Sequence, residues 1–394
     1  MTLVPTEPKK IYMWNKEIKA VYLWTTKVRP AYKPRTFTIS RTEQSNMSSW
    51  WTYSDDAAWL TAGDGAFDDF FWYSAVLLNT SGVETAEMKQ SWWVFTWAMT
   101  TLGNITSGDN VMIKFPVRWI KMTKSWSTVT LSITEEQNKD WYQYYAHSTG
   151  ALSNPWTPKK AFYLGAYKWY NSSNVIKSWS GQSPTWSVSQ ANFCTYAKNN
   201  WTWYNIEWFY QRMYINALYM MKYWNAKSQN VVGKWASSTA ARTWWTNSQT
   251  NATYWTTSTS QQMKLFWLED RWGNYAEWIW GCYTNNSKQL YVMLSWWSWA
   301  SSWWEWTWIT ISNWSYQCLS SISWENKAMF APLSTVNNYS YNTYYCDGVE
   351  VYAGRLAYWW WFGWEWEACG AFRISFSYAA GETYAYFGTR LMYL

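Results

Sequence analysis

Tryptophan occupies positions where the chain is expected to turn, and this feature limits the folds that the sequence can adopt. There are 42 Trp and 17 Gly in 394 residues, whereas ordinary usage gives Gly at about 7% and makes Trp rare. Ser-Trp-Ser at 178–180, Ser-Trp-Trp-Ser-Trp at 295–299 and the three Trp at 359–361 stand where loops are expected, and Gly is the usual residue there. We therefore interpret many of these Trp as UGA codons that the source genome reads as glycine. A protein that is truly rich in Trp is the alternative.

Charge and cysteine content exclude several classes of partner and site. The net charge is +7 with 14% charged residues, and Lys and Arg are dispersed, so no nucleic-acid partner is predicted. The five Cys include no CxxC pair, which supports neither a zinc site nor a disulfide framework. The N-terminal residues lack the apolar stretch of a signal peptide, and no run of 18 apolar residues predicts a membrane span.

Residues 1–35 have the pattern of a separate β module. Short apolar runs at 11–13, 18–23 and 28–30 are parted by Trp14-Asn15 and Trp24-Thr25. Read as Gly-Asn and Gly-Thr, these two pairs suit the turns of tight hairpins. A Pro-containing linker at 29–34 follows. We predict a β-rich connecting region over 36–108.

The pattern from residue 109 onward predicts an α+β domain over 109–394. Apolar residues at spacings of three and four predict a helix over 206–223, and Ser189 is positioned to cap a shorter helix. Alternation of Phe372, Ile374 and Phe376 with polar residues predicts a strand with those three rings in the core, before a turn at 379–382. Further strands are predicted at 111–116, 119–122, 128–134, 162–167, 290–294, 307–311 and 316–320.

Four stretches of this region resemble a known family. They are FYLGAYKWY at 162–170 with SWSGQSP at 178–184, the helical segment 192–234, FWLEDRWGNYAEWIWG at 266–281, and the tail 370–394. Together they resemble the C-type-lectin-fold ligand-binding proteins of phage tails and of diversity-generating retroelements, which are related in fold to formylglycine-generating enzymes. The resemblance implies a C-type lectin-like domain over 109–394 with a variable C-terminal segment at 354–394.

The third stretch carries the most specific part of the resemblance. Trp267 falls where the family has Gly, whereas Trp272 and Trp278 fall where it has Trp, so we expect the latter two to be real and buried. Glu269, Asn274 and Glu277 are expected to hold backbone amides of a long loop. The alternative is that these three residues and Asp270 bind calcium; no other cofactor is predicted.

The sequence does not predict an enzyme. His147 is the single histidine, and no nucleophile and acid surround it in the pattern of a triad. The related formylglycine-generating enzymes use a pair of cysteines near the C-terminus. Here Cys369 lies in that region and Cys346 lies well upstream, so the resemblance does not extend to that activity.

The resemblance implies a receptor-binding or ligand-binding protein, at a phage tail tip or a cell surface. Its partners would be a cell-surface protein or glycan, with neighbouring tail or surface proteins bound through residues 1–35 and possible self-association as a homo-oligomer. A structural virion, tail or cell-surface protein without diversified binding is the alternative. The residues expected to contact the ligand are Tyr358, Phe362, Glu365, Glu367, Ala368, Arg373, Ser375, Tyr378, Tyr384 and Tyr386.

Overall fold

The computed structural model divides the chain into two compact units, Met1–Arg35 and Thr36–Leu394. Each unit is described by itself. The structure describes residues 12–13, 16–17, 21–23, 26–28, 33–42, 51–87, 105–149, 158–232, 242–243, 246–247, 249, 251–254, 263–293, 304–311, 317–336, 347–359, 370–384 and 387–394.

The first unit contains two short antiparallel hairpins. Strand β1 (Tyr12–Met13) pairs with β2 (Lys16–Glu17), and Met13 lies opposite Lys16. Strand β3 (Val21–Leu23) pairs with β4 (Thr26–Val28) in the same way, with Leu23 opposite Thr26. Each hairpin therefore has a two-residue loop, at the two places where the sequence predicts tight turns.

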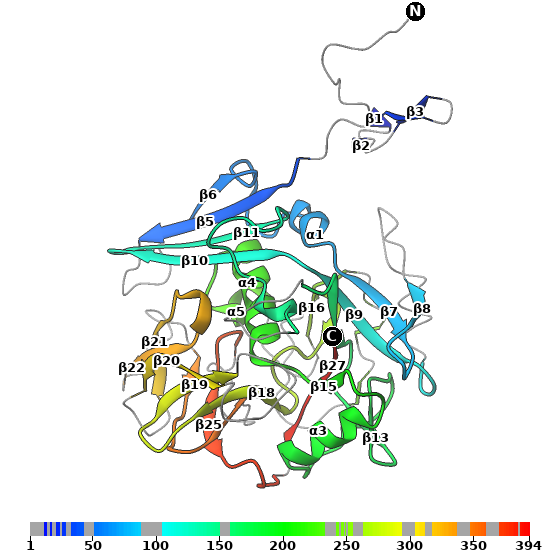
Figure 1. The fold of residues 1–394 in the computed structure, drawn as a ribbon, viewed down its shortest axis with the longest axis vertical. Coiled ribbons are helices and arrows are strands. Elements are labelled where there is room, and N and C mark those ends of the chain that lie inside the picture. The colour runs from blue at the N-terminus through cyan, green and yellow to red at the C-terminus, as the bar shows by residue number, and fades with distance from the viewer. Residues whose placement is uncertain are drawn as a thin grey trace, which may run out of the picture. The chain divides into compact units, whose positions relative to one another are not determined.

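Two of the larger sheets of the second unit consist of its earlier strands, except that one of them also includes the last strand, β27 (Figure 1). The four-stranded sheet has the order β10-β11-β5-β6, with strands Trp119–Ser125, Thr128–Thr134, Thr36–Thr42 and Thr52–Asp55. The first six-stranded sheet has the order β15-β27-β12-β9-β7-β8, with strands Tyr204–Ile206, Leu391–Tyr393, Ala161–Gly165, Asn110–Pro116, Ser74–Leu78 and Glu84–Glu87. In this six-stranded sheet, β27 lies between β15 and β12, which come much earlier in the chain.

The other two larger sheets come from the C-terminal half. The second six-stranded sheet contains β20-β19-β18-β24-β25, with strands Trp304–Thr310, Gln289–Met293, Ala276–Thr284, Leu356–Trp359 and Ser375–Tyr378; β26 (Phe387–Gly388) also pairs with β18. The three-stranded sheet has the order β22-β21-β23, with strands Pro332–Val336, Gln317–Ile322 and Gly348–Val349. Two small hairpins complete the described strands: β13 (Tyr170–Ser172) with β14 (Val175–Lys177), and β16 (Lys264–Leu265) with β17 (Leu268–Glu269).

This architecture corrects the predicted fold class. Of the described residues, 40% are in strands and 15% in helices, and the sheets are arranged like a four-bladed β-propeller, so the prediction of an α+β C-type lectin-like fold is wrong. The error has a physical reason. Helix α4 gives a long periodic signal in the sequence, whereas strands of two to seven residues between Ser, Asn and Trp resemble loops until their pairing is known.

The boundary predicted at residue 109 lies inside the second unit. Strand β5 pairs along its full length with β11, and β7 pairs with β9. Residues from both sides of position 109 therefore form the same two sheets. Near the other end of the chain, β27 pairs with both β12 and β15.

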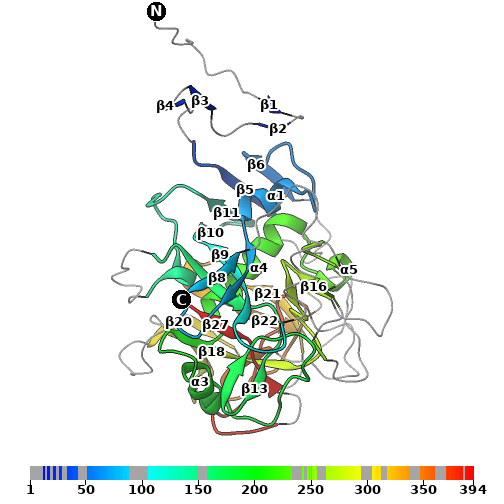
Figure 2. The same cartoon turned by 90° about the vertical axis from the view of Figure 1, so that its right-hand side faces the viewer.

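Helix α4 (Phe209–Tyr223) lies in the middle of the unit, with strands on several sides (Figure 1, Figure 2). Its side chains from Phe209 to Lys222 are buried. The helix begins three residues later than the sequence predicts, because Tyr204–Ile206 pair with Leu391–Tyr393 as strand β15 instead. The backbone N–H of Trp208 donates to the side chain of Gln211 at 3.1 Å, which helps to fix the start of the helix.

The remaining helices are shorter. Ser189 caps α3 (Gln190–Lys198) as predicted, and its hydroxyl accepts a hydrogen bond from the backbone N–H of Asn192 at 3.3 Å. The others are α1 (Ala66–Phe71), α5 (Ser228–Val232) and the 3-10 turns η1 (Tyr145–His147) and η3 (Asn326–Ala328). Among the described residues, none of these helices is long and apolar enough to cross a membrane.

Candidate recognition surface

Three C-terminal segments meet at the β25 end of the second six-stranded sheet. Strand β25 pairs with β24, and residues 350–352 run along it through an isolated parallel bridge between Val351 and Phe376. The N–H of Phe376 donates to the Glu350 carbonyl at 2.7 Å, and the N–H of Tyr352 donates to the Phe376 carbonyl at 2.7 Å. These bonds place the side chains of residues 350–352 beside those of β25, although the two segments are far apart in sequence.

The side chains presented there form a set that we call the tyrosine surface: Glu350, Tyr352, Arg355, Tyr378, Glu382 and Tyr384. Tyr352 is 42% exposed and Tyr384 is 48% exposed, while Tyr378 is half-buried between them and the interior. The ring centroids of Tyr378 and Tyr384 are 4.8 Å apart. Arg355 approaches Glu382 at 3.5 Å, and both side chains remain partly exposed.

A buried layer supports these rings from below. Tyr358 is fully buried; its ring packs against Phe387 and Trp278, with centroids 4.8 and 5.7 Å away. Its hydroxyl forms a hydrogen bond with Ser377, and the Ser377 hydroxyl donates to a Glu350 carboxylate oxygen at 3.2 Å. The carboxylate of Glu350 is thereby linked to the interior, while the nearby phenol of Tyr352 lies at the surface.

Neighbouring groups and burial keep the phenols of Tyr352 and Tyr378 protonated. The neighbouring Glu350 carboxylate, with a smaller effect of burial, raises the pKa of Tyr352. Burial and the neighbouring Tyr384 raise the pKa of Tyr378. A protonated phenol both donates and accepts hydrogen bonds, so the surface combines aromatic area with O–H donors and carboxylate acceptors.

Five of the ten predicted contact residues lie within the described part of the chain. For three of these five, the prediction of a surface position is wrong. Tyr358, Arg373 and Ser375 are buried, so they cannot contact a partner from this position. Tyr378 and Tyr384 remain accessible. The other predicted residues, Phe362, Glu365, Glu367, Ala368 and Tyr386, lie outside the described residues.

Arg373 and Ser375 are buried because residues 372–376 are covered on both faces. Phe372, Ile374 and Phe376 are buried as the alternating pattern predicts. Arg373, which the same pattern places outward, lies in the interior near the buried carboxyl of Asp347. Alternation therefore located the strand correctly but did not reveal that its second face is also covered.

Sequence reasoning missed four members of the tyrosine surface: Glu350, Tyr352, Arg355 and Glu382. The predicted turn at 379–382 is present, because the N–H of Glu382 donates to the Ala379 carbonyl at 3.1 Å. The turn alone, however, does not indicate which residues lie opposite it. Their proximity comes from the bridge between residues 350–352 and β25, and no periodic pattern in the sequence signals that bridge.

A second concentration of charge lies wholly in the interior. We call it the buried ion cluster: Lys168, Glu207, Arg212, Arg271, Glu277 and Arg390. Glu277 is 3.0 Å from Lys168, 2.7 Å from Arg212 and 3.3 Å from Arg390. Glu207 is 3.0 Å from Arg212 and 2.7 Å from Arg271. The two carboxylates therefore cross-link side chains from α4, β18 and the segments beside β12 and β27.

Burial and pairing act against each other in this cluster. Burial lowers the pKa of Lys168 to about 8, although Glu277 opposes that shift. Burial disfavours the ionised form of Glu277, yet Lys168, Arg390 and Arg212 together hold its pKa below the usual range. Both groups are charged at neutral pH, and their role is to satisfy one another inside the fold.

The four residues considered for calcium do not fit a calcium ion. Glu269 accepts hydrogen bonds from the N–H and hydroxyl of Thr246 at 3.0 and 2.6 Å. Asp270 accepts from the Asn274 amide at 2.7 Å, and Glu277 faces the three cations named above. In the described part of the chain, no group of three acidic, His or Cys side chains could hold a metal ion. Calcium binding by these residues is therefore not supported.

The other expectations for this stretch concern its aromatic residues. Trp272 and Trp278 are 2% and 1% exposed, so the prediction that both are buried is confirmed. Glu269 does hold a loop backbone amide, as expected, through its bond to Thr246.

His147 is a buried structural group. Its Nε2 lies 3.1 Å from the Phe115 carbonyl oxygen, and its ring packs between Phe162 and Tyr214. Burial lowers its pKa to about 3. Burial also raises the pKa of the Cys194 thiol to about 12 and that of the Cys318 thiol to about 11, so neither thiol is ionised at neutral pH.

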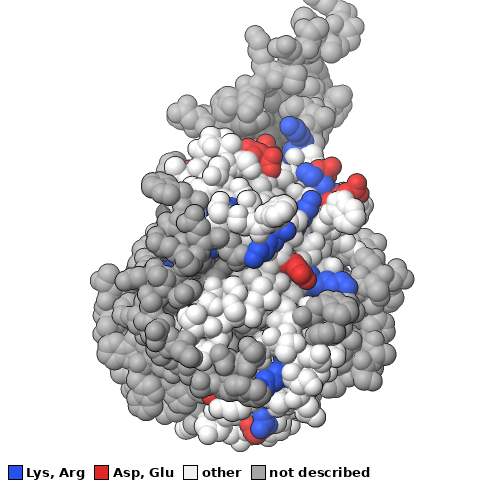
Figure 3. Space-filling model, turned by 90° about the vertical axis from the view of Figure 1, so that its left-hand side faces the viewer, with Lys and Arg blue, Asp and Glu red and all other residues white. Residues whose placement is uncertain are grey.

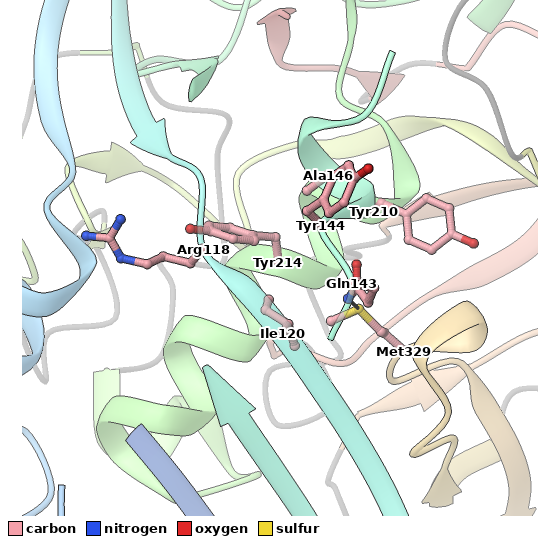
Figure 4. Close-up of a pocket in the computed structure, with 8 residues that line it drawn as sticks. All are labelled: Arg118, Ile120, Gln143, Tyr144, Ala146, Tyr210, Tyr214 and Met329. Carbon is pink, nitrogen blue, oxygen red and sulfur yellow. Dashed lines mark hydrogen bonds between the residues drawn. The ribbon is translucent and has the colours of Figure 1, made fainter. Parts of the chain in front are cut away.

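A small pocket lies near His147 and is lined by Arg118, Ile120, Gln143, Tyr144, Ala146, Tyr210, Tyr214 and Met329 (Figure 4). Its polar groups are engaged by the protein. Tyr210 and Tyr214 donate to the carbonyls of Lys327 and Pro116 at 2.9 and 2.8 Å, and Arg118 donates to the Phe70 carbonyl at 2.6 Å. This arrangement offers no side chain positioned for general acid–base or nucleophilic catalysis.

Comparison with known proteins adds no family or function. The sequence matches no protein-family model, and no curated protein matches it. We therefore infer function from the geometry of the surface itself.

Proposed function

We propose that this chain is a non-catalytic binding protein that contacts a cell-surface protein or glycan through the tyrosine surface. The observation that supports this proposal is the position of two tyrosines that are about half exposed. Tyr384 packs on the rings of Tyr378 and Phe387, and Tyr352 lies beside the Glu350 carboxylate. Tyrosine offers a large contact area at low conformational cost together with a hydroxyl, and it often dominates binding energy at recognition surfaces.

The surrounding polar groups favour a partner rich in hydrogen-bond donors over an anionic polymer. Glu350 and Glu382 supply carboxylate oxygens, and Arg355 is the only basic member of the surface. On the face shown in Figure 3, the described Lys, Arg, Asp and Glu residues lie in small mixed groups, without a large patch of one sign. This distribution does not attract nucleic acid.

The proposal places the protein at a phage tail tip or a cell surface. In this scheme the hairpins of residues 1–35 attach it to neighbouring tail or surface proteins, and the tyrosine surface contacts the target. Variation of the C-terminal segment by a retroelement remains part of the proposal. A template repeat of this segment beside the gene, together with a reverse transcriptase gene, would support that part.

The experiment compares binding of the purified protein and a Tyr352→Ala, Tyr384→Ala double variant to a panel of bacterial cells. The double variant is expected to bind at least tenfold more weakly with an unchanged melting curve. Tyr142→Ala is the matched control, because Tyr142 is a partly exposed tyrosine outside the tyrosine surface, and it is expected to bind like the parent protein.

Two results would contradict the proposal. Equal binding by the double variant and the parent would place recognition elsewhere, and an absence of binding to every cell type would favour a structural role in a virion or cell surface. Periodate treatment of the cells distinguishes a glycan target, and protease treatment distinguishes a protein target.

A further inference from the structure

Five tryptophans have a left-handed backbone conformation. The φ angles are 57° at Trp72, 54° at Trp126, 68° at Trp141, 52° at Trp224 and 67° at Trp267. Among the described non-glycine residues with positive φ, Trp is the commonest type, ahead of Asn and Asp, which are the residues that ordinarily tolerate this conformation. A bulky side chain at positive φ is strained, whereas glycine adopts it without steric cost.

Two of these tryptophans end helices. Trp72 follows α1 and its N–H donates to the Asp68 carbonyl at 2.9 Å. Trp224 follows α4 and its N–H donates to the Met220 carbonyl at 3.0 Å. A left-handed residue that closes the last helical turn in this way is most often glycine.

Two more occupy loops of tight hairpins. Ser125 pairs with Thr128, so Trp126 is the first residue of a two-residue loop between β10 and β11. Leu265 pairs with Leu268, so Trp267 is the second residue of the loop between β16 and β17, after Phe266 at φ 50°. Two-residue hairpin loops require positive φ at such positions, and glycine is the preferred residue.

Trp141 lies in the turn from Lys139 to Tyr142, where the N–H of Tyr142 donates to the Lys139 carbonyl at 3.1 Å. It is the third residue of that turn. A third residue with positive φ is the mark of a type II turn, which favours glycine there. Trp126 and Trp141 are also 96% and 81% exposed, so burial of the indole does not compensate for the backbone strain.

Other tryptophans have no positive φ and so differ in backbone angle from the five, although Trp267 is as deeply buried as they are. Trp169, Trp208 and Trp278 are buried and have ordinary backbone angles. A Cβ added at Gly281 would lie 2.5 Å from Nε1 of Trp208, and one added at Gly388 would lie 2.5 Å from Nε1 of Trp169. These glycines leave space for the two rings, which indicates that the indoles belong to the native packing.

Trp359 belongs with this second group, although it is one of the three consecutive Trp at 359–361. It is 4% exposed, its Nε1 donates to the Gly370 carbonyl at 3.1 Å, and its ring lies 4.3 Å from the Arg212 guanidinium. Position within a run of Trp therefore does not identify the recoded residues, whereas the backbone angle does.

We propose that residues 72, 126, 141, 224 and 267 are glycine in the natural protein, encoded by UGA, and that Trp169, Trp208 and Trp278 are tryptophan encoded by UGG. A genome that reads UGA as glycine produces this division when its genes are translated with UGA assigned to Trp. The proposal does not depend on the binding function.

The gene and the protein from its natural source test the proposal directly. We expect UGA at the five positions and UGG at the three. Mass spectrometry of the tryptic peptide covering residues 125–139, whose single Trp is Trp126, should give the mass with glycine. The peptide covering 272–288 is the control and should retain tryptophan at 278. UGG codons at the five positions, or an indole in the 125–139 peptide, would overturn the proposal.

A stability measurement provides a second test on recombinant protein. The combined variant Trp72→Gly, Trp126→Gly, Trp141→Gly relieves three strained positions whose indoles are largely exposed, so its melting temperature should rise by several degrees. Trp278→Gly should lower the melting temperature, because it empties a core position. A melting temperature of the triple variant below that of the parent protein would contradict the assignment.

Discussion

The buried ion cluster and the tyrosine surface each contain two carboxylates, yet the fold uses them differently. In the cluster, four cations lie within 3.3 Å of Glu207 or Glu277, and every member is almost fully buried. In the tyrosine surface, a single exposed arginine stands 3.5 Å from Glu382. Carboxylates become structural where the fold supplies cations and excludes water, and they remain available to a partner at the edge of a sheet.

The largest expected effect comes from breaking the cluster. Glu277→Gln removes the charge that Lys168, Arg212 and Arg390 share, which leaves buried cations without compensation. We expect the free energy of unfolding to fall by about 3–5 kcal/mol, measured by urea denaturation. Glu382→Gln is the matched control and should cost less than about 1 kcal/mol. Equal losses would show that the two regions do not differ as described.

His147 is buried outside both regions, and it tests how burial without an ion pair affects the pH dependence of stability. Burial lowers the pKa of His147 to about 3, while an unfolded histidine titrates near 6.5. Below pH 6.5 the folded state therefore binds fewer protons than the unfolded state, so stability falls as the pH drops from about 6.5 toward 3. The full loss is on the order of a few kcal/mol, because each pKa unit corresponds to about 1.4 kcal/mol.

His147→Gln isolates this contribution. Glutamine retains a donor for the Phe115 carbonyl and does not titrate. Urea denaturation at pH 7 and pH 4.5 should show a smaller loss of stability for the variant than for the parent. If both proteins lose the same stability over this interval, His147 is not the group responsible.

The next effect in size concerns the tyrosine surface. Tyr384→Ala should weaken binding to the target cells by about 2 kcal/mol with little change in the melting temperature, because the ring is about half exposed. Tyr384→Phe separates the hydroxyl from the ring and should cost about 0.5–1.5 kcal/mol. A large loss of folding stability in Tyr384→Ala would instead make this residue part of the core.

The smallest effect is expected at the exposed ion pair. Arg355→Ala should change the free energy of unfolding by less than about 1 kcal/mol. Raising the salt concentration should reduce this difference further, because exposed charges are screened. Thermal melting of the variant and the parent at low and at high salt measures this stability difference and its dependence on salt. A loss of stability as large as that of Glu277→Gln would contradict the contrast between the two regions.

Local features of the fold were predictable from the sequence, and their assembly was not. Spacings of three and four located α4, and the Ser189 cap located α3. The pairs Trp14-Asn15 and Trp24-Thr25, read as Gly-Asn and Gly-Thr turns, located the hairpins of the first unit. These signals arise from contacts between residues near in sequence. The arrangement of the sheets depends on pairs such as Phe37 with Ile133, which lie far apart in the chain.

The residues of the tyrosine surface were likewise only partly predictable from the sequence. Tyr378 and Tyr384 were predicted because they lie in the C-terminal segment that the family resemblance implies to be variable. Arg373 and Ser375 were misplaced because alternation reports that a strand has two faces but not that both are covered. Glu350 and Tyr352 were missed because an isolated bridge between distant segments brings them to β25.

The position of β27 has a consequence for synthesis. It lies between β12 and β15, and a ribosome that adds about 5–20 residues per second makes it roughly 10–40 seconds after β15. Until then, two strands present unpaired edges to the cell, and such edges are ready to pair with other chains. Any product that terminates before residue 391 lacks the strand that joins β12 to β15, so its sheet keeps a gap between them.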